Sequence, residues 1–528
     1  MNKKILITDP IEKACIDILA ENGFNVDLKP GLKESEIIEL INGYNVLIVR
    51  SGTKVTSRII KSASNLEMIA RAGAGVDNID VDAATSRGII VMNTPGGNTI
   101  STAEHTFGLL ISLCRNIPFA NSELKNGLWD RKKYIGTELF GKKIGIIGFG
   151  KIGKEVALRS KAFGMDVLTY DPVITTETAQ KYYARLVSFD ELLSQSDIIS
   201  IHVPLNNETR NLINKDTLEK CKSGVKIINC ARGGIVNEED LYNALETGKV
   251  SGAAIDVFEK EPPYFPNKLI EHPKVIVTPH IGASTKEAQE KVAIQIANQI
   301  VEYYKKQNLI GAVNTFPLQF RITDEIKPFV ELAKIMGKIL ASMVDVNLSH
   351  IGLKYHGKIL HEHNELISAA FLTGLLSKKI TGTVNFVNVM ILSEETGIKV
   401  KSSLESEHDD YRTLITAFVK SHSMLKKISG TIFGKNEIRI VELNDYKIDF
   451  KPGKFLVIIK NVDRPGILAT ISSVFANKNV NIAEVFLARD ELGKNALTIM
   501  ILDSSINSEV ISELQSTDGI SFVKFIVL

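Results

Sequence analysis

The sequence predicts an α/β protein with parallel sheets, followed by smaller α+β domains. In residues 1–314, short apolar runs alternate with amphipathic segments, which is the rhythm of β-α-β units and therefore of a parallel sheet. In residues 453–528, strand-like and helix-like segments follow each other in the order β-α-β-β-α-β. The length of 528 residues agrees with three or four domains of about 100–200 residues each.

The N-terminal part contains the first set of alternating elements. Its predicted strands are KILIT, NVLIVR, LEMIARAG and IIVMN, with the amphipathic segment IEKACIDILAENG after the first. The next stretch, STAEHTFGLLISLCRNIPFANSELKNG, has helical periodicity and a polar start suited to an N-cap.

The alternation resumes at Lys143 and predicts six buried strands: KIGIIGFG, MDVLTYD, DIISIHVP, VKIINCARGG, GAAIDVF and VIVTPH. A long helix follows from Ala283, and Asn314, Thr315 and Pro317 indicate a linker. Residues 318–452 begin with the helix DEIKPFVELAKIMGKILASM, and TIFGKNEIRIVEL alternates like one half-exposed strand. The last elements are KFLVIIKNV, ILATISSVFANK, NIAEVFLARD, NALTIMILD, SEVISELQS and ISFVKFIVL.

Composition and charge exclude several classes of protein. With 63 basic and 61 acidic residues, the chain has no large excess of positive charge with which to bind nucleic acid or a membrane surface. No run approaches the roughly 18 apolar residues of a membrane span, and the N-terminus is typical of a first strand rather than a signal peptide. The four cysteines form no C-x-x-C pair, which favours reduced thiols in a cytoplasmic protein over disulfides or a metal site.

The segment KKIGIIGFGKIGKEVALRSKAFGMDVLTYDP predicts a dinucleotide site in a Rossmann domain. Gly148 permits the tight turn, Gly150 lets a pyrophosphate approach the helix N-terminus, and Gly153 lets helix and strand pack closely. Asp171 ends the next strand, where a carboxylate accepts hydrogen bonds from a ribose hydroxyl and repels a 2′-phosphate. The expected cofactor is NAD rather than NADP.

Three further strand ends carry groups suited to hydride-transfer chemistry on a hydroxy acid. Arg232 follows VKIINCA, and its guanidinium suits a substrate carboxylate. His280 follows VIVTP and suits proton transfer to a carbinol, while Glu261 would fix the imidazole and favour its protonated form. Taken singly, Glu261 also fits a solvated loop acid and His280 a backbone hydrogen-bonding residue.

GFGKIG, NCARGGIV, DVFEKEPP and TPHIGAST, in this order, resemble the D-2-hydroxyacid dehydrogenase family. The resemblance implies a Rossmann domain at 99–280 and a flavodoxin-like substrate domain at 1–98, completed by 281–314. It implies that Arg232, Glu261 and His280 carry substrate binding, histidine tuning and proton transfer. It also implies further cofactor contacts from Lys151, Ile152, Ala231 and Asp256.

Two N-terminal arginines indicate a second anionic group on the substrate, such as a phosphate. Arg50 and Arg71 each follow an apolar strand, and Gly73 and Gly75 leave backbone amides for an anion. The alternative is that each arginine forms an ordinary surface ion pair. With MNTPGGNT and WDRKKYIGTEL, these stretches resemble the family members that oxidise 3-phospho-D-glycerate to 3-phosphohydroxypyruvate, the first step of L-serine biosynthesis. That resemblance adds Asn98 to the substrate pocket.

The same resemblance extends to the C-terminal half. VNFVNVMILSEETGI and GTIFGKNEIRIVE are similar to the family's α+β intervening domain, here 315–452. Residues 453–528 are similar to its ferredoxin-like βαββαβ ACT domain. The family implies a homodimer or homotetramer. The intervening domain has scattered lysines and Arg439, which fit either an anion site or a plain solvated face. The solvated face is the favoured alternative.

The turn NVDRPGI suits an amino-acid effector. Its amides near Gly466 suit a carboxylate, and Asp463 suits an ammonium group. The family resemblance adds Asn481 and implies L-serine, although Asn461 stands where some serine-sensitive relatives have histidine. The alternative is a packing module without a ligand.

Two other functions stay open at this point. One is a reductase of glyoxylate, hydroxypyruvate or 2-oxoglutarate, which Arg50 and Arg71 argue against. The other is an NAD-sensing protein without catalysis, which the amino-acid-sensor-like C-terminus argues against.

Overall fold

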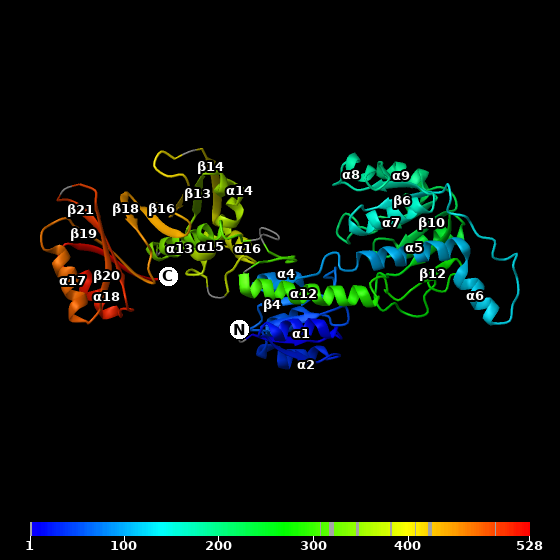
Figure 1. Cartoon of the computed structure of the whole chain (residues 1–528), viewed down its shortest axis with the longest axis horizontal. Helices are drawn as coiled ribbons and strands as arrows, with labels where there is room; N and C mark the ends of the chain where they lie inside the picture. Colours follow the sequence, from blue (N-terminus) through cyan, green and yellow to red (C-terminus); the bar gives the residue numbers. More distant parts are fainter. Residues whose placement is uncertain are drawn as a thin grey trace. The chain divides into compact units, whose positions relative to one another are not determined.

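A computed structural model describes residues 3–306, 308–315, 322–344, 348–380, 383–406, 408–420, 425–491 and 493–528. Pro317, part of the predicted linker, lies outside these residues. The chain forms two compact units, one of residues 1–10, 16–93 and 296–528 and one of residues 11–15 and 94–295. Figure 1 labels the helices and strands along the chain.

The first unit begins with a five-stranded parallel sheet in the order β2-β1-β3-β4-β5, the flavodoxin-like order that was predicted. Its strands are β1 (Lys4–Ile7), β2 (Asn25–Leu28), β3 (Val46–Val49), β4 (Met68–Arg71) and β5 (Ile90–Met92). The accompanying helices are α1 (Lys13–Glu21), α2 (Glu34–Leu40), α3 (Ser57–Ser62) and α4 (Val81–Ser86), with a short 3₁₀ helix at Ile41–Gly43. β3 is wholly buried because its four residues are all apolar.

Residues 308–315 return to this sheet after the long helix α12 (Lys286–Lys306). The Val313 amide donates to the Val91 carbonyl at 2.9 Å, and the Asn314 side chain accepts from the Val91 amide at 2.8 Å. The edge strand β5 therefore gains a partner from far along the sequence.

The second unit contains a seven-stranded parallel sheet in the order β12-β11-β10-β9-β6-β7-β8, which confirms the predicted Rossmann fold. Its strands are β6 (Lys143–Ile147), β7 (Asp166–Tyr170), β8 (Ala184–Leu186), β9 (Ile198–Ile201), β10 (Val225–Asn229), β11 (Val250–Ile255) and β12 (Val275–Val277). Its helices are α5 (Thr99–Arg115), α6 (Ile117–Lys125), α7 (Lys151–Ala162), α8 (Thr176–Gln180), α9 (Phe189–Gln195), α10 (Lys215–Lys220) and α11 (Glu238–Glu246). The strand order reverses between β6 and β9, and ligands of such sheets bind at that point.

The predicted intervening domain is a six-stranded sheet with helices packed on it. Its helices are α13 (Lys327–Met343), α14 (Lys358–Glu362), α15 (Asn364–Leu376) and α16 (Val389–Glu395). Its strands are β13 (His350–His356), β14 (Lys399–Glu405), β15 (Leu414–Lys420), β16 (Leu425–Phe433), β17 (Glu437–Leu443) and β18 (Tyr446–Phe450), and only the β13–β14 pair is parallel. The single strand predicted for TIFGKNEIRIVEL is wrong, because that stretch turns at Gly434 and joins the antiparallel strands β16 and β17.

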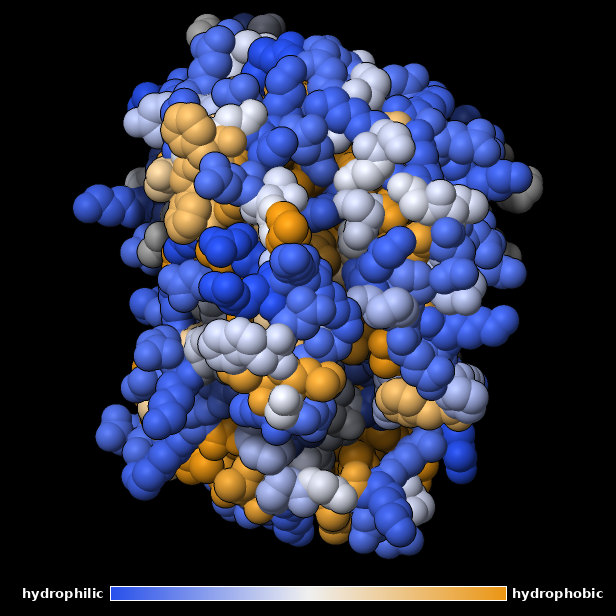
Figure 2. All heavy atoms as spheres, turned by 90° about the vertical axis from the view of Figure 1, so that its right-hand side faces the viewer, coloured by the Kyte–Doolittle hydropathy of each residue, from blue (hydrophilic) through white to orange (hydrophobic). Residues whose placement is uncertain are grey.

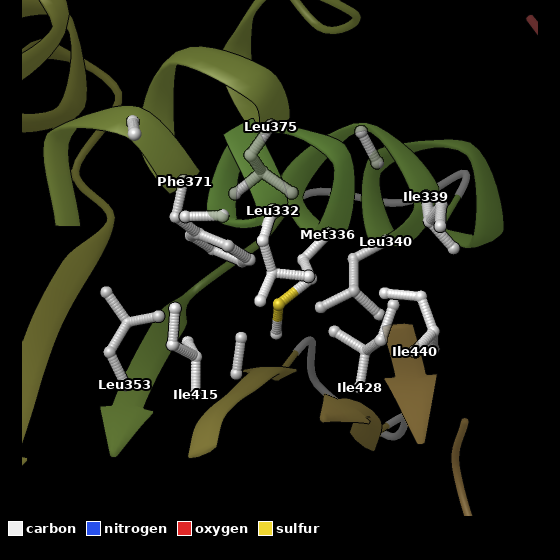
Figure 3. Close-up of a cluster of buried hydrophobic side chains, with 14 of the residues drawn as sticks. Leu332, Met336, Ile339, Leu340, Leu353, Phe371, Leu375, Ile415, Ile428 and Ile440 are labelled. Atoms are coloured by element: carbon white, nitrogen blue, oxygen red, sulfur yellow. The ribbon is translucent and has the colours of Figure 1, made fainter. Parts of the chain in front are cut away.

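The core of this domain lies between helices α13 and α15 and the sheet. Figure 3 shows Leu332, Met336 and Leu340 of α13 pointing toward Ile415, Ile428 and Ile440 of the strands. The two helices approach closely at glycines: a Cβ on Gly374 would stand 2.0 Å from the Lys334 carbonyl oxygen, and one on Gly337 would stand 2.2 Å from the Phe371 carbonyl oxygen. No larger residue fits at either position.

The last domain has an antiparallel sheet in the order β20-β21-β19-β22, which confirms the predicted ferredoxin-like βαββαβ fold. Its elements are β19 (Phe455–Val462), α17 (Ile467–Asn477), β20 (Ile482–Arg489), β21 (Asn495–Leu502), α18 (Ser508–Ser516) and β22 (Ile520–Val527). Side chains of both helices and three of the strands form one buried cluster.

Figure 2 views the side on which α6 lies in Figure 1, and apolar groups interrupt the hydrophilic surface there. Residues 117–140 contribute several exposed apolar side chains, among them Trp129 at 77% exposure, Ile135 at 82% and Phe140 at 80%. Among the described residues, no helix combines the length and the apolar character needed to cross a bilayer.

Candidate functional site

The glycine-rich turn between β6 and α7 has the shape of a phosphate cradle. Gly148 has a φ of 91°, and a Cβ there would stand 2.6 Å from the His202 carbonyl oxygen, so only glycine fits. Gly150 caps the N-terminus of α7, and a Cβ there would meet no atom within 4 Å. The space beside Gly150 is therefore open to a ligand at the positive end of a twelve-residue helix.

The remaining predicted cofactor residues of this turn differ in their contacts. Gly153 packs α7 onto the turn, since a Cβ there would stand 2.3 Å from the Gly148 carbonyl oxygen. The Asp171 carboxylate accepts hydrogen bonds from the Phe149 amide at 2.7 Å and from the Val173 amide at 2.9 Å. The exposed Lys151 donates to the Pro95 carbonyl at 3.3 Å, while Ile152 packs against the apolar core. Asp171 thus lies directly against the glycine-rich turn.

Arg232 lies in a turn that Asn229 shapes at the end of β10. The Asn229 side chain accepts from the Ala231 amide at 3.0 Å and donates to the Arg232 carbonyl at 2.9 Å. The Arg232 guanidinium donates to the Ala231 carbonyl at 2.6 Å. Gly233 follows because a Cβ there would stand 1.8 Å from the Phe258 carbonyl oxygen, so this turn lies directly against the turn after β11.

Glu261 and His280 form a hydrogen-bonded pair. His280 Nδ1 lies 2.7 Å from Glu261 Oε2, and Glu261 Oε1 accepts from the Phe258 amide at 3.1 Å. Burial raises the pKa of the Glu261 carboxyl, but the hydrogen bond and charge of His280 and the Phe258 amide outweigh it and lower that pKa overall. Glu261 is therefore a carboxylate at neutral pH, and it holds the imidazole of His280 through Nδ1.

The neighbouring strands β10, β11 and β12 bring these residues to one edge of the sheet. Asn229 of β10 pairs with Ile255 of β11, and Ile255 pairs with Val277 of β12. The turns that follow these three parallel strands carry Arg232, Glu261 and His280. The structure thus places the three predicted catalytic residues at the carboxyl edge, where ligands of such sheets bind.

Asp256, a predicted cofactor residue, is 1% exposed and accepts several hydrogen bonds from its own chain. Its donors are the Thr278 hydroxyl at 2.5 Å, the Ile281 amide at 2.9 Å and the Gly282 amide at 2.9 Å, with His105 Nε2 at 3.2 Å. Burial raises the pKa of the Asp256 carboxyl, but hydrogen bonds from His105, Thr278 and Ile281 lower it overall. It is an ionised, buried acceptor next to the His280 turn.

Sequence reasoning missed His105, Thr278 and Ser101, which surround Asp256 and this turn. His105 and Ser101 lie in AEHTF and ISTAE of α5, where they look like ordinary helix residues. The available signal was weak: a histidine on a helix whose neighbouring residues Ala103, Thr106 and Phe107 are all buried.

The predicted substrate residues of the first unit lie on adjacent strands. Arg71 ends β4 and pairs in register with Val49, the residue before Arg50. Arg50 Nη1 donates to the Pro10 carbonyl at 3.1 Å, and the Asn78 side chain donates to the Arg50 carbonyl at 2.7 Å. Asp9 completes this network by accepting from the Arg50 amide.

The backbone near Arg71 differs from the prediction. The Gly73 amide is not free for an anion, since it donates to the Arg71 carbonyl at 2.9 Å. The Arg71 guanidinium donates to the Gly75 carbonyl and lies 3.0 Å from where a Gly73 Cβ would stand. A side chain at position 73 would be in tight contact with the guanidinium.

Asn98, in the second unit, precedes helix α5 without a side-chain capping bond. Its carbonyl accepts from the Thr102 amide at 3.0 Å. The polar start predicted to cap this helix, Ser101 and Thr102, instead lies within α5, which begins at Thr99.

The predicted effector residues of the last domain have polar partners within the chain. Asp463 accepts from the Gly493 amide at 3.1 Å and from Arg489 at 3.4 Å. Gly466, at a φ of 88°, precedes α17 and has open space around it. The Asn481 side chain donates to Asp503 at 2.6 Å.

Comparison with known families identifies three domains. The NAD binding domain of D-isomer specific 2-hydroxyacid dehydrogenases matches residues 107–282. The D-3-phosphoglycerate dehydrogenase intervening domain matches residues 325–444, and the ACT domain matches residues 455–519.

Individual relatives extend the likeness over the whole chain. D-3-phosphoglycerate dehydrogenase of Archaeoglobus fulgidus is 40% identical over 527 residues, 99% of this chain and 100% of the relative. The Bacillus subtilis enzyme of the same name is 38% identical over 99% of each chain. Among solved structures, D-lactate dehydrogenase from Aquifex aeolicus, complexed with NAD and lactic acid, is 29% identical with a TM-score of 0.52, over 57% of this chain and 95% of its own.

Proposed function

The chain belongs to the D-isomer specific 2-hydroxyacid dehydrogenases, among the D-3-phosphoglycerate dehydrogenases, and from this we propose that it oxidises 3-phospho-D-glycerate to 3-phosphohydroxypyruvate with NAD. This is the first step of L-serine biosynthesis. The observation that carries the proposal is the Glu261–His280 pair at 2.7 Å, at the same sheet edge as Arg232.

His280 transfers the proton of the substrate hydroxyl. Because Nδ1 is held by Glu261, Nε2 accepts the hydroxyl proton in oxidation and returns it to the carbonyl oxygen in reduction. Glu261 stabilises the imidazolium that forms. NAD, when bound, would supply the acceptor for the hydride of the carbinol carbon, while His280 takes the proton of its hydroxyl.

Charged groups bind the two ends of the substrate. We assign the substrate carboxylate to Arg232, whose guanidinium can grip it with two hydrogen bonds. We assign the phosphate to Arg50, Arg71 and Gly73, and we assign Asn98 to the substrate as well.

The glycine-rich turn binds the cofactor. The open space at Gly150 accepts the pyrophosphate, and Asp171 accepts hydrogen bonds from a ribose hydroxyl, beside Lys151 and Ile152. We also assign Ala231 and Asp256 to the cofactor. In this scheme, residues 99–280 form the cofactor domain, 1–98 and 281–314 the substrate domain, 315–452 the intervening domain and 453–528 the ACT domain.

The test is reduction of phosphohydroxypyruvate with NADH, with glyoxylate, hydroxypyruvate and 2-oxoglutarate as competing substrates. We expect the phosphorylated substrate to have the highest kcat/KM. His280→Ala should lower kcat by about 10²–10⁴-fold without weakening NADH binding, while His350→Ala, an exposed histidine of β13, serves as the matched control.

Arg71→Ala should raise KM for phosphohydroxypyruvate at least tenfold and leave KM for hydroxypyruvate unchanged. An unchanged KM for phosphohydroxypyruvate would sink the phosphate assignment and favour another 2-oxo acid. NADH binding without turnover of any of these acids would instead favour the non-catalytic sensor.

L-serine is the proposed effector of the ACT domain, with Asp463, Gly466 and Asn481 as its contacts. The turn before α17 offers backbone amides for the carboxylate, and Asp463 offers a negative charge for the ammonium group. Millimolar L-serine should inhibit the wild-type chain, whereas Asp463→Ala should be insensitive with unchanged basal activity. Full activity of the wild-type chain at that concentration would contradict the assignment.

A second copy of the chain is the proposed partner of the exposed apolar residues of segment 117–140: Ile117, Leu124, Leu128, Trp129, Ile135 and Phe140. Aromatic side chains bury about 150–250 Å² each, so the group provides a large part of the about 800 Å² that each partner contributes to a stable interface. Light scattering should find a dimer or tetramer whose mass falls in Trp129→Ser/Phe140→Ser. The four free, buried cysteines agree with our placement of the enzyme in the reducing cytoplasm.

A further inference from the structure

A buried polar cluster connects helix α5 to the turn that carries His280. His105, in the second turn of α5, has its Nε2 3.2 Å from the Thr278 hydroxyl and 3.2 Å from Asp256 Oδ1. The His105 side chain is 19% exposed and that of Asp256 is 1% exposed. The cluster is thus largely removed from water, where hydrogen bonds contribute more than at a surface.

The hydrogens of this cluster can be assigned from its donors. The Thr278 hydroxyl donates to Asp256 Oδ1 at 2.5 Å, so its lone pairs are left to accept from His105 Nε2. Asp256 accepts at the same time from the amides of Ile281 and Gly282. His105 therefore supplies the N–H at the outer end of a chain that ends on the backbone around His280.

Asp256 holds the His280 turn from both sides. Thr278 lies two residues before His280, and Ile281 and Gly282 follow it directly. From the same helix as His105 and one turn earlier, Ser101 donates to the Gly282 carbonyl at 2.6 Å. The backbone on either side of the imidazole is thus tied to α5 and to the end of β11.

The turn needs such support because His280 has a left-handed backbone with a φ of 53°. A non-glycine residue in this region costs on the order of 1 kcal/mol or more and persists when its surroundings hold it. If the backbone relaxed, the imidazole would move away from Glu261, its orienting partner. A displacement of about 1 Å at a catalytic group can cost about a hundredfold in rate.

We propose that His105 is a positioning residue: its Nε2–H, through Thr278 and Asp256, holds the turn on which His280 meets Glu261. His105 itself contacts neither Glu261 nor His280 in the described hydrogen bonds, so it acts only through this chain of contacts. The inference rests on the proposed function in that it assigns proton transfer to His280.

The kinetic test compares His105→Leu with His105→Gln. Leucine removes the donor at similar volume, whereas glutamine keeps an N–H at a similar reach. We expect His105→Leu to lower kcat by about 10–100-fold, with KM for the 2-oxo acid and the NADH dissociation constant within about threefold of wild type. His105→Gln should restore kcat to within about threefold. Glu104→Gln, on the adjacent exposed residue, is the control and should behave as wild type.

The structural test does not depend on turnover. A crystal structure of His105→Leu without cofactor should show His280 out of its left-handed conformation or Nδ1 more than 3.5 Å from Glu261. Thr278→Val interrupts the same chain at its next member and should reproduce both effects, which keeps the proposal testable should the leucine variant not fold.

Three results would overturn the proposal: a wild-type kcat in His105→Leu, an equal loss in the glutamine and leucine variants, or an unchanged His280–Glu261 geometry in the leucine structure. Failure of the proposed function has a different signature, since the wild-type chain would then not reduce phosphohydroxypyruvate. In that case the kinetic test uses whichever 2-oxo acid the wild-type chain reduces, and the structural test is unaffected.

Discussion

At the scale of single residues, the carboxylate of Glu261 fixes the charge next to His280 Nδ1. The lowered pKa of Glu261 keeps it ionised at neutral pH, so it always presents a negative charge to Nδ1. Because the folded pKa is depressed, the pair stabilises the fold above the ordinary carboxyl value of 4.5. This contribution is lost as the pH falls through the lower folded value.

Glu261→Gln keeps the shape of the side chain and removes the charge. Glutamine can still hold the imidazole but cannot balance the positive charge that the imidazole carries when it holds the proton, so kcat at neutral pH should fall about tenfold or more. Steady-state reduction of phosphohydroxypyruvate by the wild type and by Glu261→Gln at neutral pH checks this. A wild-type kcat in Glu261→Gln would mean that Glu261 only fixes the geometry of His280.

The sequence predicted the position of the candidate residues at one sheet edge better than their surroundings. Arg232, Glu261 and His280 each follow an apolar strand within six residues, and a parallel sheet brings such positions to one edge. The Gly73 amide and the His105 cluster could not be predicted in this way. Their contacts join residues distant in sequence or depend on a local turn, and neither leaves a periodic pattern.

At the scale of elements, Gly148 and Gly150 of the β6–α7 turn have different roles. A Cβ on Gly148 would need a strained φ and would meet the His202 carbonyl at 2.6 Å, whereas one on Gly150 would enter open space. Gly148→Ala should therefore lower the free energy of unfolding by about 2 kcal/mol or more. Gly150→Ala should leave stability within about 0.5 kcal/mol of wild type but weaken NADH binding at least tenfold.

Urea unfolding and calorimetric titration with NADH measure the two effects separately. Equal NADH affinity in Gly150→Ala and wild type would show that the pyrophosphate does not approach this glycine. An unchanged unfolding midpoint in Gly148→Ala would show that the turn adopts another path.

The elements themselves were predictable where they are buried on both faces. KIGII and VKIIN are mostly apolar, and four of the five residues in each strand are buried, as expected of a parallel sheet with helices on both faces. The edge strands β2 and β8, with sequences NVDL and ARL, mix polar and apolar residues and escaped prediction. The β16–β17 hairpin was read as one strand because Gly434 was not recognised as its turn.

At the scale of the whole molecule, separate buried cores predict separate unfolding transitions. The clusters under the Rossmann sheet lie within residues 103–276, whereas the cluster under α13 and α15 lies within residues 326–526, so they share no side chain. Chains with several such cores commonly unfold in more than one step. Differential scanning calorimetry should therefore resolve at least two transitions.

The two transitions can be assigned by changes that each shift the midpoint temperature of one transition alone. NADH at a hundred times its dissociation constant stabilises the state that binds it by about 2.7 kcal/mol, so it should raise only the transition of the Rossmann core, by about 5–10 °C. Gly374→Ala should lower only the other, because its Cβ would meet the Lys334 carbonyl at 2.0 Å and the resulting overpacking costs about 1–3 kcal/mol. A single transition that responds to both changes would mean that the cores unfold as one cooperative unit, and effects at the C-terminal domains would then reach the His280 turn through global stability.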